Sequence, residues 1–131
     1  MQRVSHFLAR KAHERASLIY ICTHNSRRSH LGQVWAAIAA AVYGFAEAET
    51  FSGGTEATAF NLNAVNALRR CGVAVVNTHT PNRDPNPAYL MAFSDEKPSS
   101  LLFSKVYDDP ANPQKDFAAI MVCSQADEAC P

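Results

Sequence analysis

The residues best suited to chemistry are Cys22 and Arg28, which are separated by five polar residues. A cysteine thiolate is a strong nucleophile, and a nearby cation or helix N-terminus stabilises it. An arginine can hold a tetrahedral oxyanion through two of its fixed N–H donors. The spacing therefore predicts covalent chemistry on an oxyanion. The alternative interpretation is a buried structural cysteine beside a solvated pair, Arg27 and Arg28.

The elements around this pair fit the chemical interpretation. Residues 18–21 form an apolar run of the length expected for a strand buried on both faces, and Ser29 can cap a helix that begins near His30. Ligands of open α/β sheets bind outside the carboxyl ends of the strands, where helix N-termini attract anions. The expected oxyanion-binding residues are Thr23, His24, Asn25, Ser26, Arg27 and Arg28.

Helical and apolar patterns alternate along the rest of the chain. We expect helices over 4–16, from about 30 to Gly44 and over 61–70, with Val34, Trp35 and Ile38 on the buried face of the second. Strands are predicted over 46–52, 73–76 and 117–122, and a hairpin-like pair over 89–93 and 101–106. This alternation is typical of an α/β fold with a parallel sheet.

The segment Cys22-Thr23-His24-Asn25-Ser26-Arg27-Arg28-Ser29 resembles the Cys-x5-Arg-Ser loop of low-molecular-weight protein tyrosine phosphatases and of the thioredoxin-coupled arsenate reductases that share their fold. The resemblance implies that Cys22 is the nucleophile, Arg28 holds the oxyanion and Ser29 stabilises the thiolate, with Asn25 shaping the loop. It also implies a flavodoxin-like three-layer sandwich with a four-stranded parallel sheet in the order 2-1-3-4. Ser52 matches a position that supports the loop, although a plain turn explains residues 51–56 equally well.

Two further cysteines, Cys123 and Cys130, follow the last predicted strand. Cys123 lies at the carboxyl end of its strand, as Cys22 does, so the fold can bring both thiols to one edge of the sheet. The Cys-x6-Cys spacing resembles the redox segment of the arsenate reductases, which implies a relay through Cys22, Cys123 and Cys130 with thioredoxin or another thiol donor as reductant. Zinc is the alternative, but no second Cys or His pair has metal-ligand spacing, and we expect no metal and no cofactor.

Composition excludes several other classes of function. The 131 residues, 47% hydrophobic, suit a single domain over 1–131, and twelve basic residues balance twelve acidic ones. This balance gives no reason to expect nucleic acid or an anionic membrane as partner. The aliphatic content argues against a disulfide scaffold, and no signal peptide is recognisable, so we expect a cytoplasmic protein. Cys71 is interpreted as a buried, inert helix residue.

The preferred hypothesis is an arsenate reductase. The alternatives are a phosphatase that hydrolyses phosphomonoesters through a cysteinyl phosphate, and a non-catalytic oxyanion-binding domain. An Asp-Pro general acid is expected after Cys123 but is not present, which suggests truncation at the C-terminus. Asp108 and Asp109 precede a proline but lie before Cys123.

Overall fold

The structure is a computed structural model, and it describes residues 2–10, 15–45, 47–78 and 84–124. Within these ranges the helices are α1 (Gln2–Arg10), α2 (Arg28–Val42) and α3 (Leu62–Arg70). The strands are β1 (Ala16–Cys22), β2 (Ala48–Gly54), β3 (Ala74–Asn77), β4 (Tyr89–Ala92), β5 (Ser100–Leu102) and β6 (Phe117–Met121). The described residues include no helix long and apolar enough to cross a bilayer.

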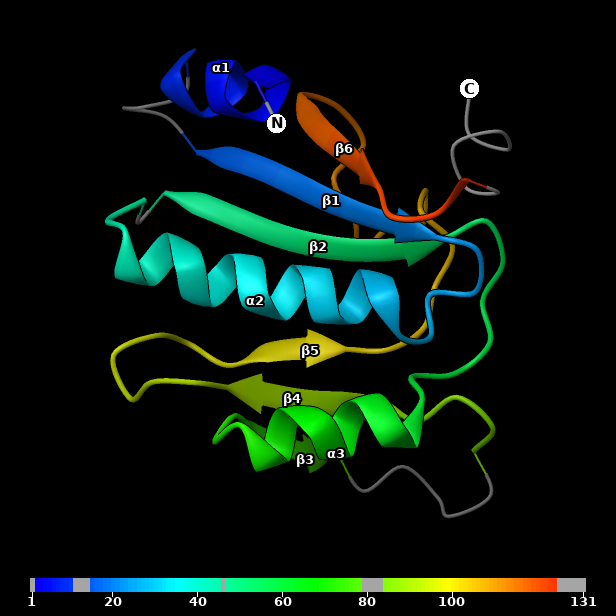
Figure 1. The fold of residues 1–131 in the computed structure, drawn as a ribbon. Coiled ribbons are helices and arrows are strands. Elements are labelled where there is room, and N and C mark those ends of the chain that lie inside the picture. The colour runs from blue at the N-terminus through cyan, green and yellow to red at the C-terminus, as the bar shows by residue number, and fades with distance from the viewer. Residues whose placement is uncertain (1, 11–14, 46, 79–83, 125–131) are drawn as a thin grey trace.

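The first sheet carries the predicted central strand. It is parallel, with the order β2-β1-β6, and Ile21 of β1 is in register with Gly53 of β2 and Met121 of β6. Its three strands therefore end at the same edge, on the right in Figure 1. Buried Leu18, Ile19 and Ile21 explain why the apolar run in β1 forms the middle of this sheet.

The second sheet corrects the predicted topology. The expected parallel sheet has three strands among the described residues, not four in the order 2-1-3-4, and β6 pairs directly with β1. The expected third strand, β3, instead pairs antiparallel with β4, and β4 with β5. In β3 only Val75 is buried, so this strand has one covered face and suits a half-exposed antiparallel sheet. The apolar run predicted the strand correctly but could not identify its partner.

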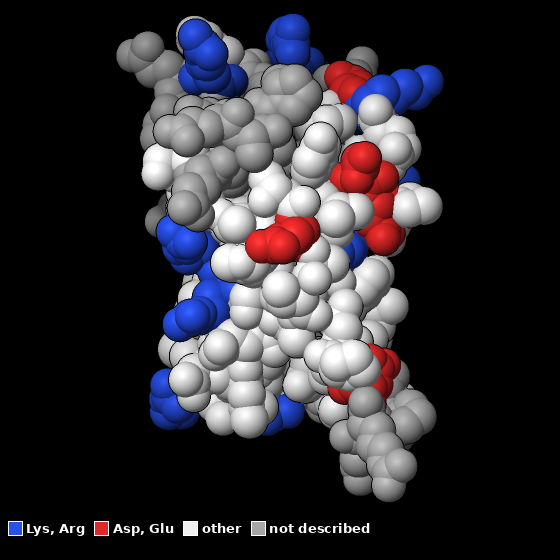
Figure 2. Space-filling model, turned by 90° about the vertical axis from the view of Figure 1, so that its right-hand side faces the viewer, with Lys and Arg blue, Asp and Glu red and all other residues white. Residues whose placement is uncertain are grey.

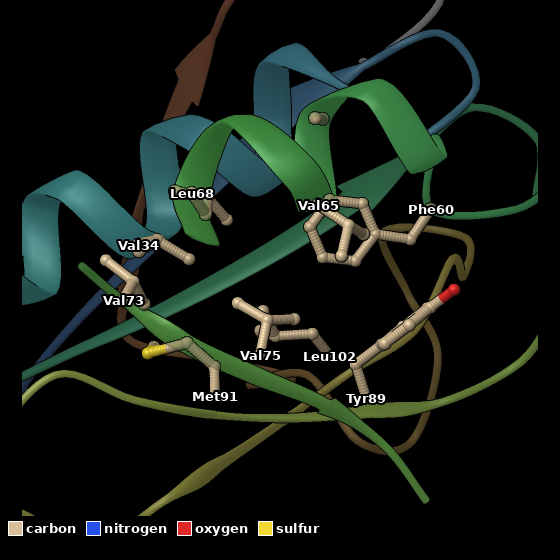
Figure 3. Packing of buried hydrophobic residues seen from close by; sticks show 10 residues of the cluster. Val34, Phe60, Val65, Leu68, Val73, Val75, Tyr89, Met91 and Leu102 are labelled. Atoms are coloured by element: carbon tan, nitrogen blue, oxygen red, sulfur yellow. The ribbon is translucent and has the colours of Figure 1, made fainter. Parts of the chain in front are cut away.

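The largest hydrophobic cluster lies between the second sheet and the two helices α2 and α3 (Figure 3). Val34 of α2 packs there with Val65 and Leu68 of α3 and with Val75 and Leu102 of the strands. α2 also contacts β1 and β2, so it lies between the two sheets (Figure 1). This double packing fixes the helix whose first turn follows Cys22.

The outer parts of α2 differ from expectation. Leu31 and Ile38 pack against the cluster, but Trp35 is 45% exposed, so its prediction as a core residue is wrong. Trp35 is one residue from Val34 and three from Ile38, so the helical pattern alone puts it close to the buried face. The two sheets that contact α2 decide which side of the helix is buried, and Trp35 lies at the edge of that side.

Candidate functional site

The thiol of Cys22 lies at the carboxyl end of β1 and faces the first turn of α2. Its Sγ is 3.0 Å from Oγ of Ser29, and both residues are buried. Nδ2 of Asn25 donates to the same Ser29 Oγ at 2.7 Å. Because a hydroxyl has only one hydrogen, and its oxygen already accepts from Asn25, the Ser29 hydrogen is available for the sulfur.

This use of Ser29 corrects its expected role as the N-cap of the helix. α2 begins at Arg28, and the N-cap residue Arg27 makes no side-chain capping hydrogen bond. Ser29 lies inside the first turn with its hydroxyl turned toward Cys22 and Asn25. The serine that follows the arginine therefore contacts the thiol instead of the backbone N–H groups at the helix end.

Asn25 holds the loop in a conformation that few residue types adopt. Its φ is +46°, in the left-handed region that asparagine tolerates better than most residues, and its side chain is fully buried. Besides donating to Ser29, it accepts a hydrogen bond from the backbone N–H of Lys105 at 2.9 Å. One amide side chain thus ties the thiol network to a segment eighty residues away in sequence.

The backbone carbonyls of the loop are held by residues outside it. The pairs are Cys22 O with Thr55 N (3.1 Å), Thr23 O with Glu56 N (2.9 Å), His24 O with Ser104 Oγ (3.0 Å) and Ser26 O with Asn61 N (2.9 Å). Carbonyls fixed in this way keep their negative ends away from the enclosed space. With the carbonyl oxygens directed away, the electrostatic potential inside the loop favours an anion.

Gly54, at the end of β2, is essential to this close packing. A Cβ atom at Gly54 would lie 2.6 Å from the carbonyl oxygen of Glu56 and 2.7 Å from both Asn25 N and Thr23 O. All three are backbone atoms, which cannot rotate away. Glycine is therefore required where β2 meets the loop.

A cavity of about 530 Å³ opens over the sulfur and is named here the loop cavity. It is lined by Cys22, His24, Ser26, Arg27, Arg28 and Thr58. Arg27 and Arg28 are exposed, and neither forms an ion pair with another described residue. The rim also carries an ion pair between His24 Nε2 and Glu56 Oε1 at 2.8 Å.

Figure 2 views the end of the molecule where β1 and β2 finish. Below the undescribed atoms, basic side chains gather along the left of this face and acidic ones at its centre and right. The charges that cancel over the whole chain are therefore separated locally. Arg27 and Arg28, which have no ion-pair partner among the described residues, make an anion the favoured occupant of the cavity.

Ser52, predicted to support the loop, instead contacts the helix next to it. Its Oγ lies 3.3 Å from Nδ1 of His30, and the His30 ring stacks on Phe60 with centroids 4.0 Å apart. Burial, and secondarily the charge of Lys105, lowers the pKa of His30 from 6.5 to about 3. His30 is therefore neutral at pH 7 and packs as a polar member of the core.

Cys123 lies beside the loop but on the other face of the sheet from Cys22. Its Sγ is 3.3 Å from Oγ1 of Thr23, and Val122 N donates to Ile21 O at 2.9 Å. Cys123 packs with Ile19 and Ile21, whose side chains alternate with that of Cys22 along β1. The fold brings the two cysteines to one edge, and a disulfide between them requires local rearrangement. Cys130 lies outside the described residues.

The aspartates considered as acids do not reach the loop cavity. Neither Asp108 nor Asp109 lines it, and Oδ1 of Asp109 accepts a hydrogen bond from Ala111 N at 2.9 Å. Asp109 thus shapes a turn of its own segment. Cys71, expected to be buried, is an exposed residue at the end of α3.

Sequence reasoning missed Lys105 and Ser104 as neighbours of the loop, whereas the resemblance of residues 51–56 had placed Gly54 beside it. Gly53 and Gly54 had a recognisable signal, since paired glycines after a strand indicate a close backbone approach. Lys105 and Ser104 had none, because their backbone and hydroxyl contacts depend on how a distant segment crosses the loop.

No group of three or more His, Cys, Asp or Glu side chains in the described part of the chain could hold a metal ion. Neither a scan against protein-family models nor searches of characterised proteins and of solved structures found a match to this chain.

Proposed function

We propose that the chain is a thiol-dependent arsenate reductase that binds its oxyanion in the loop cavity. The observation that carries this proposal is the 3.0 Å contact between Cys22 Sγ and Ser29 Oγ at a cavity that Arg28 also lines. A hydroxyl that can donate to the sulfur stabilises negative charge there. The guanidinium of Arg28 offers two parallel donors to an arsenate.

In the first step the Cys22 thiolate attacks arsenic, and an arsenate oxygen leaves as water after protonation. The product is an As(V) adduct joined to Cys22 by a sulfur–arsenic bond. Arg28 and the loop amides hold the remaining oxygens, whose charge they balance throughout. The leaving oxygen needs a proton donor, and neither Asp108 nor Asp109 is among the residues that line the cavity.

In the second step the Cys123 thiolate attacks the sulfur of Cys22. A sulfur–sulfur bond forms, the sulfur–arsenic bond breaks, and its electron pair passes to arsenic, which leaves as arsenite. Cys130 then exchanges into this disulfide to release Cys22, and an external dithiol such as thioredoxin reduces the final pair. The position of Cys123 supports this order, because its Sγ contacts Thr23, the residue that follows Cys22 in the loop.

Mass spectrometry of thiol states after incubation of the full chain with arsenate tests the relay. We expect a disulfide that includes Cys123, together with arsenite release. Cys123→Ser should abolish arsenite release, and Cys22→Ser should abolish both the adduct and the disulfide. The matched control is Cys71→Ser, which removes an exposed thiol at the end of α3 and should behave as the unmodified protein. Equal arsenite release by the Cys123→Ser variant and the unmodified protein would rule out the relay.

The second candidate is a phosphomonoesterase that forms a cysteinyl phosphate on Cys22. It is favoured by one observation, the packing of Cys123 on the face of the sheet opposite to Cys22. Hydrolysis of an aryl phosphate that survives Cys123→Ser but not Cys22→Ser would support this function. An oxyanion bound in the loop cavity with no turnover of either substrate would instead support a non-catalytic binding domain.

A further inference from the structure

The reaction proposed above needs a proton donor at a definite place in the loop cavity. Displacement at a tetrahedral centre puts the leaving oxygen roughly in line with the attacking atom and on its opposite side. Cys22 is only 3% exposed, so its sulfur lies at the base of the cavity. The leaving oxygen then points toward the mouth of the cavity, and the donor must be there.

The side chains that line the cavity leave one candidate for this donor. Cys22 is the nucleophile, and an arginine cannot be deprotonated in a protein. Serine and threonine hydroxyls are not ionised near neutral pH, whereas histidine is the side chain that ordinarily gains and loses a proton between pH 5 and 8. The lining residues are Cys22, His24, Ser26, Arg27, Arg28 and Thr58, so His24 is the histidine that the described structure places there.

His24 lies at the mouth of the cavity, where a carboxylate orients its ring. Its Nε2 is 2.8 Å from Oε1 of Glu56, and the two side chains are 53% and 60% exposed. A carboxylate bonded to one ring nitrogen fixes the imidazole and leaves the other nitrogen, Nδ1, to carry the proton that is transferred. Solvent exposure lets water return a proton to the ring after each turnover.

Backbone contacts hold both members of this pair in place. The carbonyl oxygen of His24 accepts hydrogen bonds from Ser104 Oγ at 3.0 Å and from Thr58 Oγ1 at 3.1 Å. The backbone N–H of Glu56 donates to Thr23 O at 2.9 Å. The imidazole and the carboxylate therefore extend from two segments that are already fixed around the loop. Removal of the imidazole should leave these backbone contacts intact.

We propose that His24 is the catalytic acid of the loop cavity and that Glu56 is its positioning residue, an assignment that rests on the function proposed above. As the Cys22 sulfur bonds to arsenic, the imidazolium of His24 gives its proton to the departing hydroxyl oxygen. The arsenic–oxygen bond breaks and water leaves. The imidazole stays neutral until it takes a proton from solvent, and Glu56 remains ionised throughout. In phosphomonoester hydrolysis the same proton would go to the leaving alcohol.

Steady-state arsenate reduction by the full chain at pH 7 tests this assignment with His24→Gln, which keeps a polar side chain but cannot release a proton. We expect kcat to fall by about 10²-fold or more, as for the loss of other general acids. KM should change little, because Arg28 and the loop amides hold the anion. Glu56→Gln should cause a smaller fall in kcat. The matched control is His6→Gln on the exposed side of α1, which should leave kcat unchanged.

Added imidazole separates proton donation from a structural role of the side chain. It should restore the kcat of His24→Gly in proportion to the concentration of imidazolium, and it should not restore Cys22→Ser. Calorimetric titration with inorganic phosphate should give the same affinity for His24→Gly and the unmodified protein, which shows that the loop is intact.

Two results would overturn the assignment of His24 while leaving the proposed function in place. One is full kcat in His24→Gln when the unmodified chain is active. The other is a His24→Gly variant that binds phosphate but gains no activity from imidazolium. If the unmodified full chain neither reduces arsenate nor hydrolyses an aryl phosphate, the proposed function fails, and this assignment fails with it.

Discussion

The loop cavity, of about 530 Å³, and a second cavity of about 510 Å³ lined by α2, β2 and the segments around β5, named the edge cavity, are nearly equal in volume but differ in lining. The loop cavity is at the end of a parallel strand and the start of a helix, and its lining holds a thiol and two arginines without carboxylate partners. The edge cavity is at the side of β2, and its lining combines alanines and phenylalanines with charged Glu49, Lys97 and Lys105. The comparison shows that the backbone setting, more than size, decides what each cavity can bind.

The two cavities are joined by a single residue. The backbone N–H of Lys105 holds Asn25 behind the loop, while its side chain lines the edge cavity. Changes confined to one cavity should therefore leave the other intact, and a side-chain substitution at Lys105, which keeps the backbone N–H, should act on the edge cavity alone. The predictions below use this separation.

The largest effect is expected for Arg28→Lys. A lysine keeps the charge but cannot form the two parallel N–H···O bonds of a guanidinium. We expect arsenate reduction to fall by about 10²–10³-fold, similar to the loss of one oxyanion donor in other enzymes. Steady-state kinetics measures this, and urea unfolding is the control, which should show the same stability for the variant and the unmodified protein. A lysine variant with full activity would contradict the assignment of Arg28.

A smaller effect is expected for Gly54→Ala. The added Cβ would press on backbone atoms of Thr23, Asn25 and Glu56, so we expect a loss of about 1–3 kcal/mol in the free energy of unfolding, as for other overpacked sites. Oxyanion binding should weaken as well, because the loop must move.

Gly44→Ala is the control for that experiment. Gly44 has a φ of +79° and no atom within 4 Å of an added Cβ, so alanine there strains the backbone without touching the loop. Urea unfolding should detect a loss of stability in both variants, but only Gly54→Ala should impair oxyanion binding. Equal binding by both variants would show that the close approach at Gly54 is unimportant.

The smallest effect is a pH dependence from Lys105. Its pKa is about 8 in the folded protein and 10.5 when unfolded, so between these values the unfolded chain binds more protons. Stability must then increase with pH, by about 1 kcal/mol between pH 7 and pH 9. Urea unfolding of the unmodified protein and of Lys105→Met should differ by this amount in their pH dependence. The same rise in both proteins would exclude Lys105 as its source.

Several features of the site were predictable from local sequence. The apolar run before Cys22 requires a buried strand, and Leu62–Arg70 forms the expected helix, with the side chain of Asn61 capping it. The close spacing of Cys22, Asn25 and Ser29 allows one loop to join them. These relations depend on neighbours within a few residues, which the sequence specifies directly.

Other features depended on contacts between distant segments. Local sequence patterns did not specify the pairing of β3 with β4 or the exposure of Trp35. They also did not specify the face of the sheet on which Cys123 packs. An apolar strand has the same composition whichever partner it finds. The choice depends on which faces the rest of the chain covers.

The sequence by itself determined that a thiol and a guanidinium would share one short loop between a strand and a helix. Only the tertiary structure decided that Gly54 and Lys105 enclose this loop, and that the amide oxygens of Gln33 and Asn112 are buried without a hydrogen-bond partner among the described residues. The physical reason is that the contacts among Cys22, Asn25 and Ser29 join residues that are close in the chain. Close approach and burial instead depend on contacts between distant segments, which local sequence patterns do not specify.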